Sequence, residues 1–211
     1  MTKTFELMGA AALVIGLGLG AAQAQDGDFD PANMRCLDFV NGQGDSATTK
    51  SRADVARIWI MGYLTGNYSG REKLELVDDE DAENKAIRAI LSKCRENPEV
   101  TLLTVSEFVA SDRGRDIPNT LRNEFNPSTY MCGDYADGRQ GSASEVLKAD
   151  LADVWAFAFV QGFVNTKDPD LMIPVENKSA ITGAIASNCA KNRDFSYFAL
   201  TSAVAPMVTP Q

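Results

Sequence analysis

The sequence contains no histidine among its 211 residues, and this absence removes several kinds of chemistry. Without imidazole, the chain cannot form a Ser–His or Cys–His nucleophilic site, a His-ligated zinc centre or a histidine switch that titrates between about pH 5 and 8. An enzyme made from this chain would have to use carboxylates for catalysis, or a metal ion for which the sequence shows no binding motif. We therefore predict a protein that is not an enzyme and that needs no cofactor.

Basic residues are also scarce, with 20 Lys and Arg against 29 Asp and Glu, which gives a formal net charge of −9. This sign is wrong for gripping a nucleic-acid backbone or an anionic membrane surface. After residue 24, no stretch of the sequence is apolar and long enough to cross a bilayer, for which a helix needs about 20 residues. The sequence thus predicts no nucleic-acid partner and no stable membrane insertion.

A long uncharged stretch lies near the N-terminus. Lys3 precedes a run without charges from Leu7 to Ala22, which ends in the small-x-small pattern Ala22-Gln23-Ala24. These features are typical of a secretory signal peptide, here residues 1–24. The alternative is an uncleaved anchor, which is less favoured because the run is shorter than a membrane-spanning helix. We expect an exported mature chain that begins at Gln25.

Four cysteines are present but no CxxC motif, so the short-spaced thiol pairs of metal and redox sites are missing. In an exported protein, an even number of cysteines favours disulfides. Cys36 and Cys94 are 58 positions apart, and Cys132 and Cys189 are 57 apart. Such nearly equal spacings indicate an internal repeat.

Aligning the sequence with itself supports a duplication. An offset of 96 pairs both tryptophans, and after one deletion an offset of 95 pairs the second cysteines. The aligned pairs are Cys36/Cys132, Asp38/Asp134, Ala56/Ala152, Trp59/Trp155 and Gly66/Gly162, followed by Ile90/Ile185, Cys94/Cys189, Asn97/Asn192 and Val109/Val204. The duplication predicts disulfides within the repeats, Cys36–Cys94 and Cys132–Cys189. The other two connectivities would cross-link the repeats.

The apolar residues of each repeat follow a helical period. One stripe runs from Val55 to Gly66 and its counterpart from Leu151 to Gly162, and Ser51 is the expected N-cap of the first. A second helix should end near the second cysteine of each repeat, and Asn97-Pro98 is expected to begin a third. The predicted fold is all-α, with two small disulfide-stapled helical bundles in tandem after the cleaved signal peptide.

The stretch from 111 to 129 separates the two repeats. It contains Gly114, Pro118 and Pro127 among charged and amide residues, so we interpret it as a linker in which Leu121 and Phe125 could form one packed helical turn. The predicted organisation is a signal peptide over 1–24, a first repeat over 25–110, the linker over 111–129 and a second repeat over 130–211.

Three segments of the first repeat resemble a known family. Cys36-Leu37-Asp38-Phe39, the segment Trp59 to Gly66 (WIMGYLTG) and Cys94-Arg95-Glu96-Asn97-Pro98 are similar to the HdeA/HdeB family, from about Met34 to Val109. A second, weaker copy runs from Tyr130 to Val204. It keeps Cys132, Asp134, Trp155, Gly162 and Cys189 but has Ala158-Phe159 in place of Gly62-Tyr63 and Arg193 in place of Pro98.

The resemblance implies a periplasmic acid-stress chaperone. Such a holdase is folded and inactive near neutral pH, and in acid it exposes apolar surface that keeps acid-denatured client proteins from aggregating. Single-domain members associate as dimers, whereas this chain carries two copies. We therefore expect the repeats to pack on each other as an intramolecular pseudo-dimer.

The expected client-binding or inter-repeat surface consists of apolar residues on the two corresponding stripes. They are Trp59, Tyr63, Leu64, Trp155, Phe159 and Phe163. At neutral pH the two tryptophans are expected to be core residues. The alternative function is an exported helical module, of the kind that immunity proteins represent, which binds one specific protein partner.

Overall fold

The structure, a computed structural model, describes residues 29–44, 47–71, 76–77, 80–112, 117–118 and 125–208. The predicted signal peptide, residues 1–24, lies outside these ranges, as does Leu121 of the predicted linker turn. The all-α prediction is confirmed, because helices make up most of the described chain. One short parallel pairing joins β1 (Leu76–Val77) to β2 (Ile117–Pro118).

The helices follow the same order in each half of the chain. The first half has α1 (Cys36–Asn41), α2 (Ala47–Gly70), α3 (Glu80–Glu96) and α4 (Leu102–Asp112). The second half has α5 (Cys132–Gly138), α6 (Ala143–Asn165), the short 3-10 helix η2 (Val175–Asn177), α7 (Lys178–Lys191) and α8 (Tyr197–Val208). Each half thus contains a short helix, a long helix, a helix that bears the second cysteine, and a closing helix.

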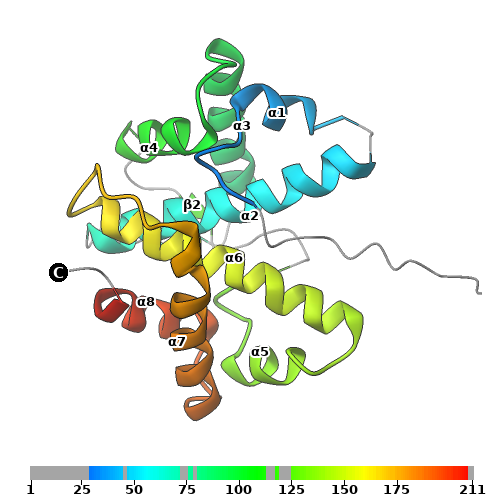
Figure 1. Cartoon of the computed structure of the whole chain (residues 1–211), viewed down its shortest axis with the longest axis vertical. Coiled ribbons are helices and arrows are strands. Elements are labelled where there is room, and N and C mark those ends of the chain that lie inside the picture. The colour runs from blue at the N-terminus through cyan, green and yellow to red at the C-terminus, as the bar shows by residue number, and fades with distance from the viewer. Residues whose placement is uncertain are drawn as a thin grey trace, which may run out of the picture.

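The two long helices cross at the centre of the molecule (Figure 1). Helices α1, α3 and α4 lie on one side of this crossing, and α5, α7 and α8 lie on the other. The core is continuous from one half to the other, because buried residues of α2 and α6 belong to the same cluster. The contact between α2 and α6 is therefore the main junction between the two halves.

Both predicted disulfides are present, Cys36–Cys94 and Cys132–Cys189. Each one joins the short first helix of its half to the helix that bears the second cysteine. The backbone around them follows the same pattern in both halves. The Cys36 amide donates to the Val100 carbonyl over 2.9 Å, and the Cys132 amide donates to the Phe195 carbonyl, also over 2.9 Å.

Two predicted helix starts are wrong. Helix α2 begins at Ala47, so Ser51 lies inside the helix rather than at its N-cap. No proline or glycine occurs between Ala47 and Ser51 to prevent this extension toward the N-terminus.

The second error concerns the third helix. Asn97-Pro98 begins a turn, which the Val100 amide closes by donating to the Asn97 carbonyl over 3.3 Å. The Pro98 carbonyl accepts a hydrogen bond from the Leu37 amide over 3.0 Å. Helix α4 begins only at Leu102, where the Thr101 hydroxyl accepts the Thr104 amide over 3.2 Å as an N-cap does. The pairing with α1 thus displaces the start of the helix.

Candidate functional site

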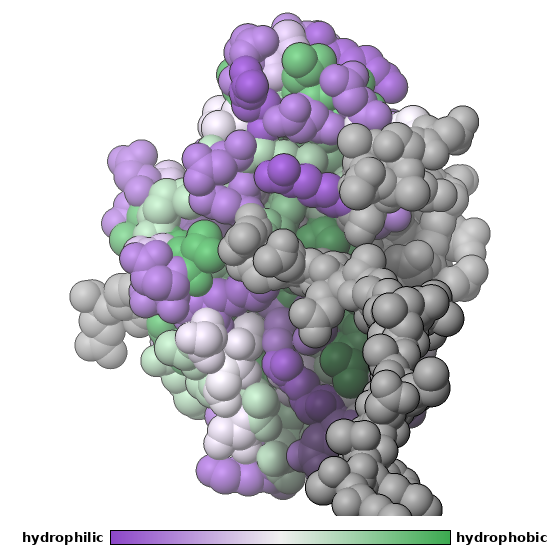
Figure 2. Space-filling model, turned by 45° about the vertical axis from the view of Figure 1, so that its right-hand side comes forward, coloured by the Kyte–Doolittle hydropathy of each residue, from purple (hydrophilic) through white to green (hydrophobic). Residues whose placement is uncertain are grey.

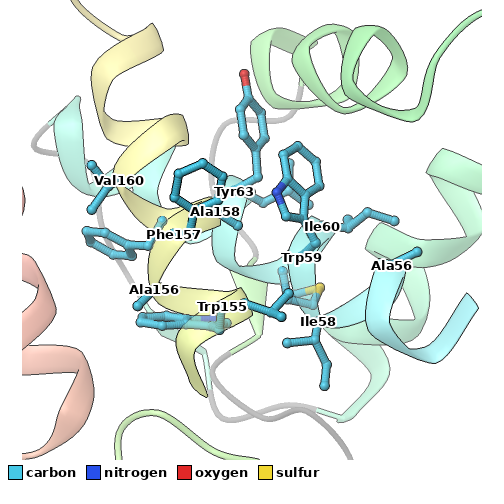
Figure 3. Packing of buried hydrophobic residues seen from close by; sticks show 14 of the residues in the cluster. Ala56, Ile58, Trp59, Ile60, Tyr63, Trp155, Ala156, Phe157, Ala158 and Val160 are labelled. Carbon is cyan, nitrogen blue, oxygen red and sulfur yellow. The ribbon is translucent and has the colours of Figure 1, made fainter. Parts of the chain in front are cut away.

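The residues predicted as the client-binding or inter-repeat surface lie on the two crossing helices. Trp59, Tyr63 and Leu64 belong to α2, and Trp155, Phe159 and Phe163 belong to α6. Five of the six are at most 2 % exposed, and Phe163 is partly buried. In Figure 3, Tyr63 and Ala158 lie between the two helix ribbons, with Trp59 and Trp155 close by. The candidate surface is therefore hidden in the folded chain.

Glycines allow the two helices to approach until their backbones touch. A Cβ atom added to Gly66 would lie 2.6 Å from the carbonyl carbon of Phe159 and still closer to its oxygen. One added to Gly162 would lie 2.9 Å from the carbonyl carbon of Tyr63. Ordinary contacts of a Cβ atom begin at about 3.4 Å, so no side chain fits at either position. The Gly62-x-x-x-Gly66 spacing thus serves close packing of α2 on α6.

The contacts also give the direction of the helices. Along α2, the glycines Gly62, Gly66 and Gly70 face residues of increasing number toward the end of α6. These are Trp155, Phe159, and Phe163 with Thr166, so the two helices are parallel. The contacts are reciprocal at the offset of 96. Gly66 meets Phe159, while its counterpart Gly162 meets Tyr63, the counterpart of Phe159. Reciprocity of this kind is the signature of an isologous, two-fold interface.

Some polar atoms are buried in α2. The Asn67 side-chain amide donates to the Gly162 carbonyl over 3.3 Å and so ties α2 to α6. Its oxygen and the indole nitrogen of Trp59 have no hydrogen-bond partner among the described residues. A buried polar atom without a partner costs about 1–3 kcal/mol, so this region is less stable than its apolar packing alone would make it.

Aromatic rings are distributed unevenly between the halves. Seven rings form one connected cluster in the second half: Phe125, Tyr130, Tyr135, Trp155, Phe159, Tyr197 and Phe198. Phe125, from the predicted linker, is 1 % exposed and contacts three of the other rings. In the first half, the described ring contacts connect Phe29, Trp59 and Tyr63.

One carboxylate is buried in the second half. Asp153 is 8 % exposed, accepts a hydrogen bond from the Tyr135 hydroxyl over 2.7 Å and pairs with the Arg139 guanidinium. Burial raises the pKa of Asp153, while the hydrogen bond from Tyr135 and the charge of Arg139 act in the opposite direction. The net effect is a raised pKa for Asp153, because the carboxylate loses more by desolvation than it gains from a guanidinium that is itself partly solvated.

A second carboxylate with an altered pKa lies near the junction of the halves. Burial raises the pKa of Glu107 on α4, and the negative charge of Asp170 in the second half raises it further. Two exposed carboxylates show the opposite shift. A hydrogen bond from Lys93 lowers the pKa of Glu96, and hydrogen bonds from Ser142 lower that of Glu145.

Metal or membrane sites are not apparent in the described part of the chain. Its acidic and cysteine side chains form no group of three or more suited to holding a metal ion. None of its helices combines the length and apolarity needed to cross a bilayer. The face in Figure 2 shows hydrophilic residues interspersed with small apolar groups.

The comparison with protein families gives a clear match. The model described as the HdeA/HdeB family matches residues 6–104, which contain the first disulfide and the whole of α2. The first half of the chain therefore belongs to the HdeA/HdeB family. The match ends before the second half begins, and no curated protein and no solved structure matches the chain. Members of the HdeA/HdeB family are periplasmic acid-stress chaperones rather than enzymes.

Several contacts of this fold had little or no signal in the sequence. Asp153 is the last charged residue of α6 and is followed at once by the apolar segment around Trp155, which could have indicated a buried carboxylate. Phe125 was expected to pack within the linker, but nothing in the sequence indicated that it joins the ring cluster of the second half. Glu107 became notable only when the fold brought α4 and the Asp170 loop together.

Proposed function

We propose that this HdeA/HdeB-family protein is a periplasmic holdase that acid activates, and that the facing sides of α2 and α6 are its client-binding surface. The mature chain would begin after a signal peptide of 24 residues. A first repeat over 25–110, a linker over 111–129 and a second repeat over 130–211 would follow. The two repeats would form an intramolecular pseudo-dimer.

The reciprocal packing of α2 on α6 carries this proposal. Buried faces of α2 and α6 cover one another across glycines, and the residues that meet are counterparts in the two halves. An isologous contact between two copies of a unit is what a symmetric homodimer makes. Here one chain supplies both copies, so the surface is hidden without a second molecule.

Linking the two copies changes how the surface can be exposed. Dilution separates a dimer, but a tether keeps the two repeats at a high effective concentration. Opening therefore requires a change in the free energy of the fold itself. Acidification is the change that the composition favours.

Charge supplies the driving force. Removing the signal peptide takes away Lys3 and Glu6, which leaves 19 basic and 28 acidic side chains. Aspartate and glutamate have reference pKa values of about 3.9 and 4.3, so strongly acid conditions would move the side-chain charge from −9 to about +19. Repulsion at +19 favours expansion and also keeps complexes with clients in solution.

The individual carboxylates act in two directions. The lowered pKa values of Glu96 and Glu145 mean that these groups stabilise the fold above their unfolded pKa and lose that contribution as the pH falls through their folded values. The raised pKa values of Asp153 and Glu107 have the opposite sign, because protonation favours the folded state. Opening in acid must therefore come from general repulsion and lost surface pairs.

An aggregation assay tests the proposal. The mature fragment 25–211 is added to an unrelated acid-sensitive protein at pH 2–3 and at pH 7, and light scattering is recorded together with the near-ultraviolet circular dichroism of the fragment alone. We expect suppression of scattering only in acid, together with loss of the tertiary signal of Trp59 and Trp155.

If a fragment that is folded at pH 7 fails to suppress aggregation at pH 2–3, the proposal is contradicted. Retention of the native dichroism in acid, with tight stoichiometric binding of one partner at pH 7, would instead establish the exported binding module. An oligomeric-state measurement at neutral pH by light scattering is a further check, because an obligate dimer would contradict the intramolecular pseudo-dimer.

A further inference from the structure

The two repeats differ most in the number of cations that they keep in acid. When all carboxylates are protonated, the first repeat, 25–110, retains ten basic side chains and the second repeat, 130–211, retains six. The first set is Arg35, Lys50, Arg52, Arg57, Arg71, Lys73, Lys85, Arg88, Lys93 and Arg95; the second is Arg139, Lys148, Lys167, Lys178, Lys191 and Arg193. Ten like charges form about three times as many repelling pairs as six.

Four of these cations lie on one helix of the first repeat. Helix α3 bears Lys85, Arg88, Lys93 and Arg95, whereas its counterpart α7 bears Lys178 and Lys191. At neutral pH, Glu96 on α3 pairs with Lys93 over 2.9 Å, and Glu99 pairs with Arg35 over 3.2 Å. Acid removes these carboxylate charges, and in the second repeat that of Asp137, which pairs with Arg193 over 2.6 Å, but it leaves more cations in the first repeat to repel one another.

The aromatic core favours the second repeat. Six of its seven connected rings are buried and Phe198 is partly buried, and burial of apolar surface does not depend on protonation. The first repeat lacks an equivalent cluster among its described residues, where three rings are in contact. The second repeat therefore keeps a larger share of its stabilising interactions in acid.

Uncharged amides strengthen the second repeat further. Buried Gln161 and Asn165 hold the loop that follows α6. The Gln161 amide donates to the Leu171 carbonyl over 2.9 Å, its oxygen accepts the Ile173 amide over 2.8 Å, and Asn165 donates to the Pro169 carbonyl over 3.0 Å. Their counterparts in the first repeat are Thr65 and Ser69, and Thr65 donates within its own helix to Met61.

The side-chain contacts that join the short-helix region to the long helix, here called braces, also differ between the repeats. In the second repeat, Asp153 faces Tyr135 and Arg139 of the α5 region, Lys178 at the start of α7 and Tyr197 on α8, with Asp150 beside Arg139. Protonation of Asp153 favours the folded state, because burial raises its pKa.

The corresponding positions of the first repeat hold Arg57 and Gln43, which share a hydrogen bond of 2.5 Å. This brace contains no carboxylate, so acid does not strengthen it. At the junction, Glu107 faces Tyr63 and Asp170, Arg71 lies near Tyr63, and protonation of Glu107 relieves repulsion from Asp170. That single contact opposes opening of the first repeat, against the ten cations that favour it.

We propose that acid opens the two repeats in order, the first repeat before the second. The α2 face of the first repeat then becomes the first client-binding surface, and the second repeat remains a folded scaffold that carries α6. The role of the α2 face in client binding rests on the proposed function, whereas the order of opening can be measured without any client.

The chain contains one tryptophan in each repeat, at corresponding positions, and this allows a direct test. In the mature chain, Trp155→Phe leaves Trp59 as the reporter of the first repeat, and Trp59→Phe leaves Trp155 as the reporter of the second. Fluorescence is recorded from pH 7 to pH 2. We expect the Trp59 signal to change at a pH at least about half a unit higher than the Trp155 signal. Equal midpoints, or the reverse order, would overturn the proposal.

A measurement on the unsubstituted chain guards against destabilisation by the substitutions. Pulsed hydrogen exchange at each pH, mapped by peptides, should show loss of protection in α2 and α3 before α6 and α7. If the order appears but aggregation is not suppressed, the order stands and the holdase function fails. If aggregation is suppressed while both repeats open together, the function stands and the order fails.

A charge-transfer variant tests the cause. Arg88→Gln and Arg95→Gln remove two exposed cations from α3, and Ala180→Lys and Ala190→Arg place two at exposed positions of α7. The total charge is unchanged, and each repeat then holds eight cations. We expect the gap between the two midpoints to shrink by at least half. An unchanged gap would overturn the electrostatic origin of the order.

Discussion

Replacing Gly66 by alanine tests the contact on which the proposed function depends. The new Cβ atom would lie 2.6 Å from the Phe159 carbonyl carbon and 2.8 Å from its Cα, against an ordinary minimum of about 3.4 Å. The atoms that it meets belong to the backbone of α6 and cannot rotate away. The helices must therefore separate by about 1 Å, which breaks packing along the whole crossing.

The expected loss of stability follows from this displacement. Overpacking of a well-filled core costs typically 1–3 kcal/mol, and a rigid obstacle places Gly66→Ala at the upper end, at about 3 kcal/mol. For a chain of this size, each kcal/mol lowers the melting temperature by about 2–4 °C. Thermal unfolding of the mature fragment at pH 7 should thus shift downward by roughly 6–12 °C.

Gly183→Ala is the matched control. Gly183 is exposed in α7, and a Cβ atom there would meet nothing within 4 Å. The substitution removes the flexibility of a helical glycine and should raise stability by about 0.5–1 kcal/mol. In the aggregation assay, Gly66→Ala should become active at a higher pH than the unsubstituted chain, while Gly183→Ala should not. An unchanged melting temperature for Gly66→Ala would refute the close contact between the helices.

The remaining predictions concern the disulfide, the buried ring and the buried carboxylate. Cys94→Ser opens the loop of 58 residues closed by Cys36 and should lower the free energy of unfolding by roughly 4 kcal/mol, measured in urea without reductant; an unchanged midpoint would contradict a stabilising bridge. Phe125→Ala should cost about 3–5 kcal/mol, because the ring is buried among other aromatic rings, whereas a linker residue outside the core would cost almost nothing in the same titration. Asp153→Asn removes the group whose protonation favours folding, so the advantage of the unsubstituted chain in urea should grow as the pH falls from 7 toward 4. A shrinking advantage would mean that pairing with Arg139 outweighs burial.

The sequence by itself determined the local architecture. Helical spacing of apolar residues, duplicated at offsets of 96 and 95, led to the all-α fold, and the equal cysteine spacings led to both disulfides. These features depend on short-range periodicity and on chain distance, which a sequence records directly. The glycine spacing Gly62-x-x-x-Gly66 is typical of close helix packing, but only the structure shows that its partner is α6.

Helix boundaries were less accessible to sequence reasoning. Asn97-Pro98 has the residues of a helix start, yet the Pro98 carbonyl pairs with the Leu37 amide some 60 residues away in the chain, and Thr101 caps α4 instead. The residues favour a helix start, but a tertiary hydrogen bond that needs the same backbone in another conformation prevents the helix from beginning there. The same residue types then form a turn.

The tertiary structure alone decided which groups face each other. Phe125 enters the ring cluster and Asp153 is buried against Arg139 through packing within the second half. Glu107 approaches Asp170 because the two halves pack together across α2 and α6. Burial and charge proximity depend on distances between segments that are far apart in the chain. A pKa shift is a property of that environment rather than of the residue type, so the sequence supplied the carboxylates and the fold decided which of them resist acid.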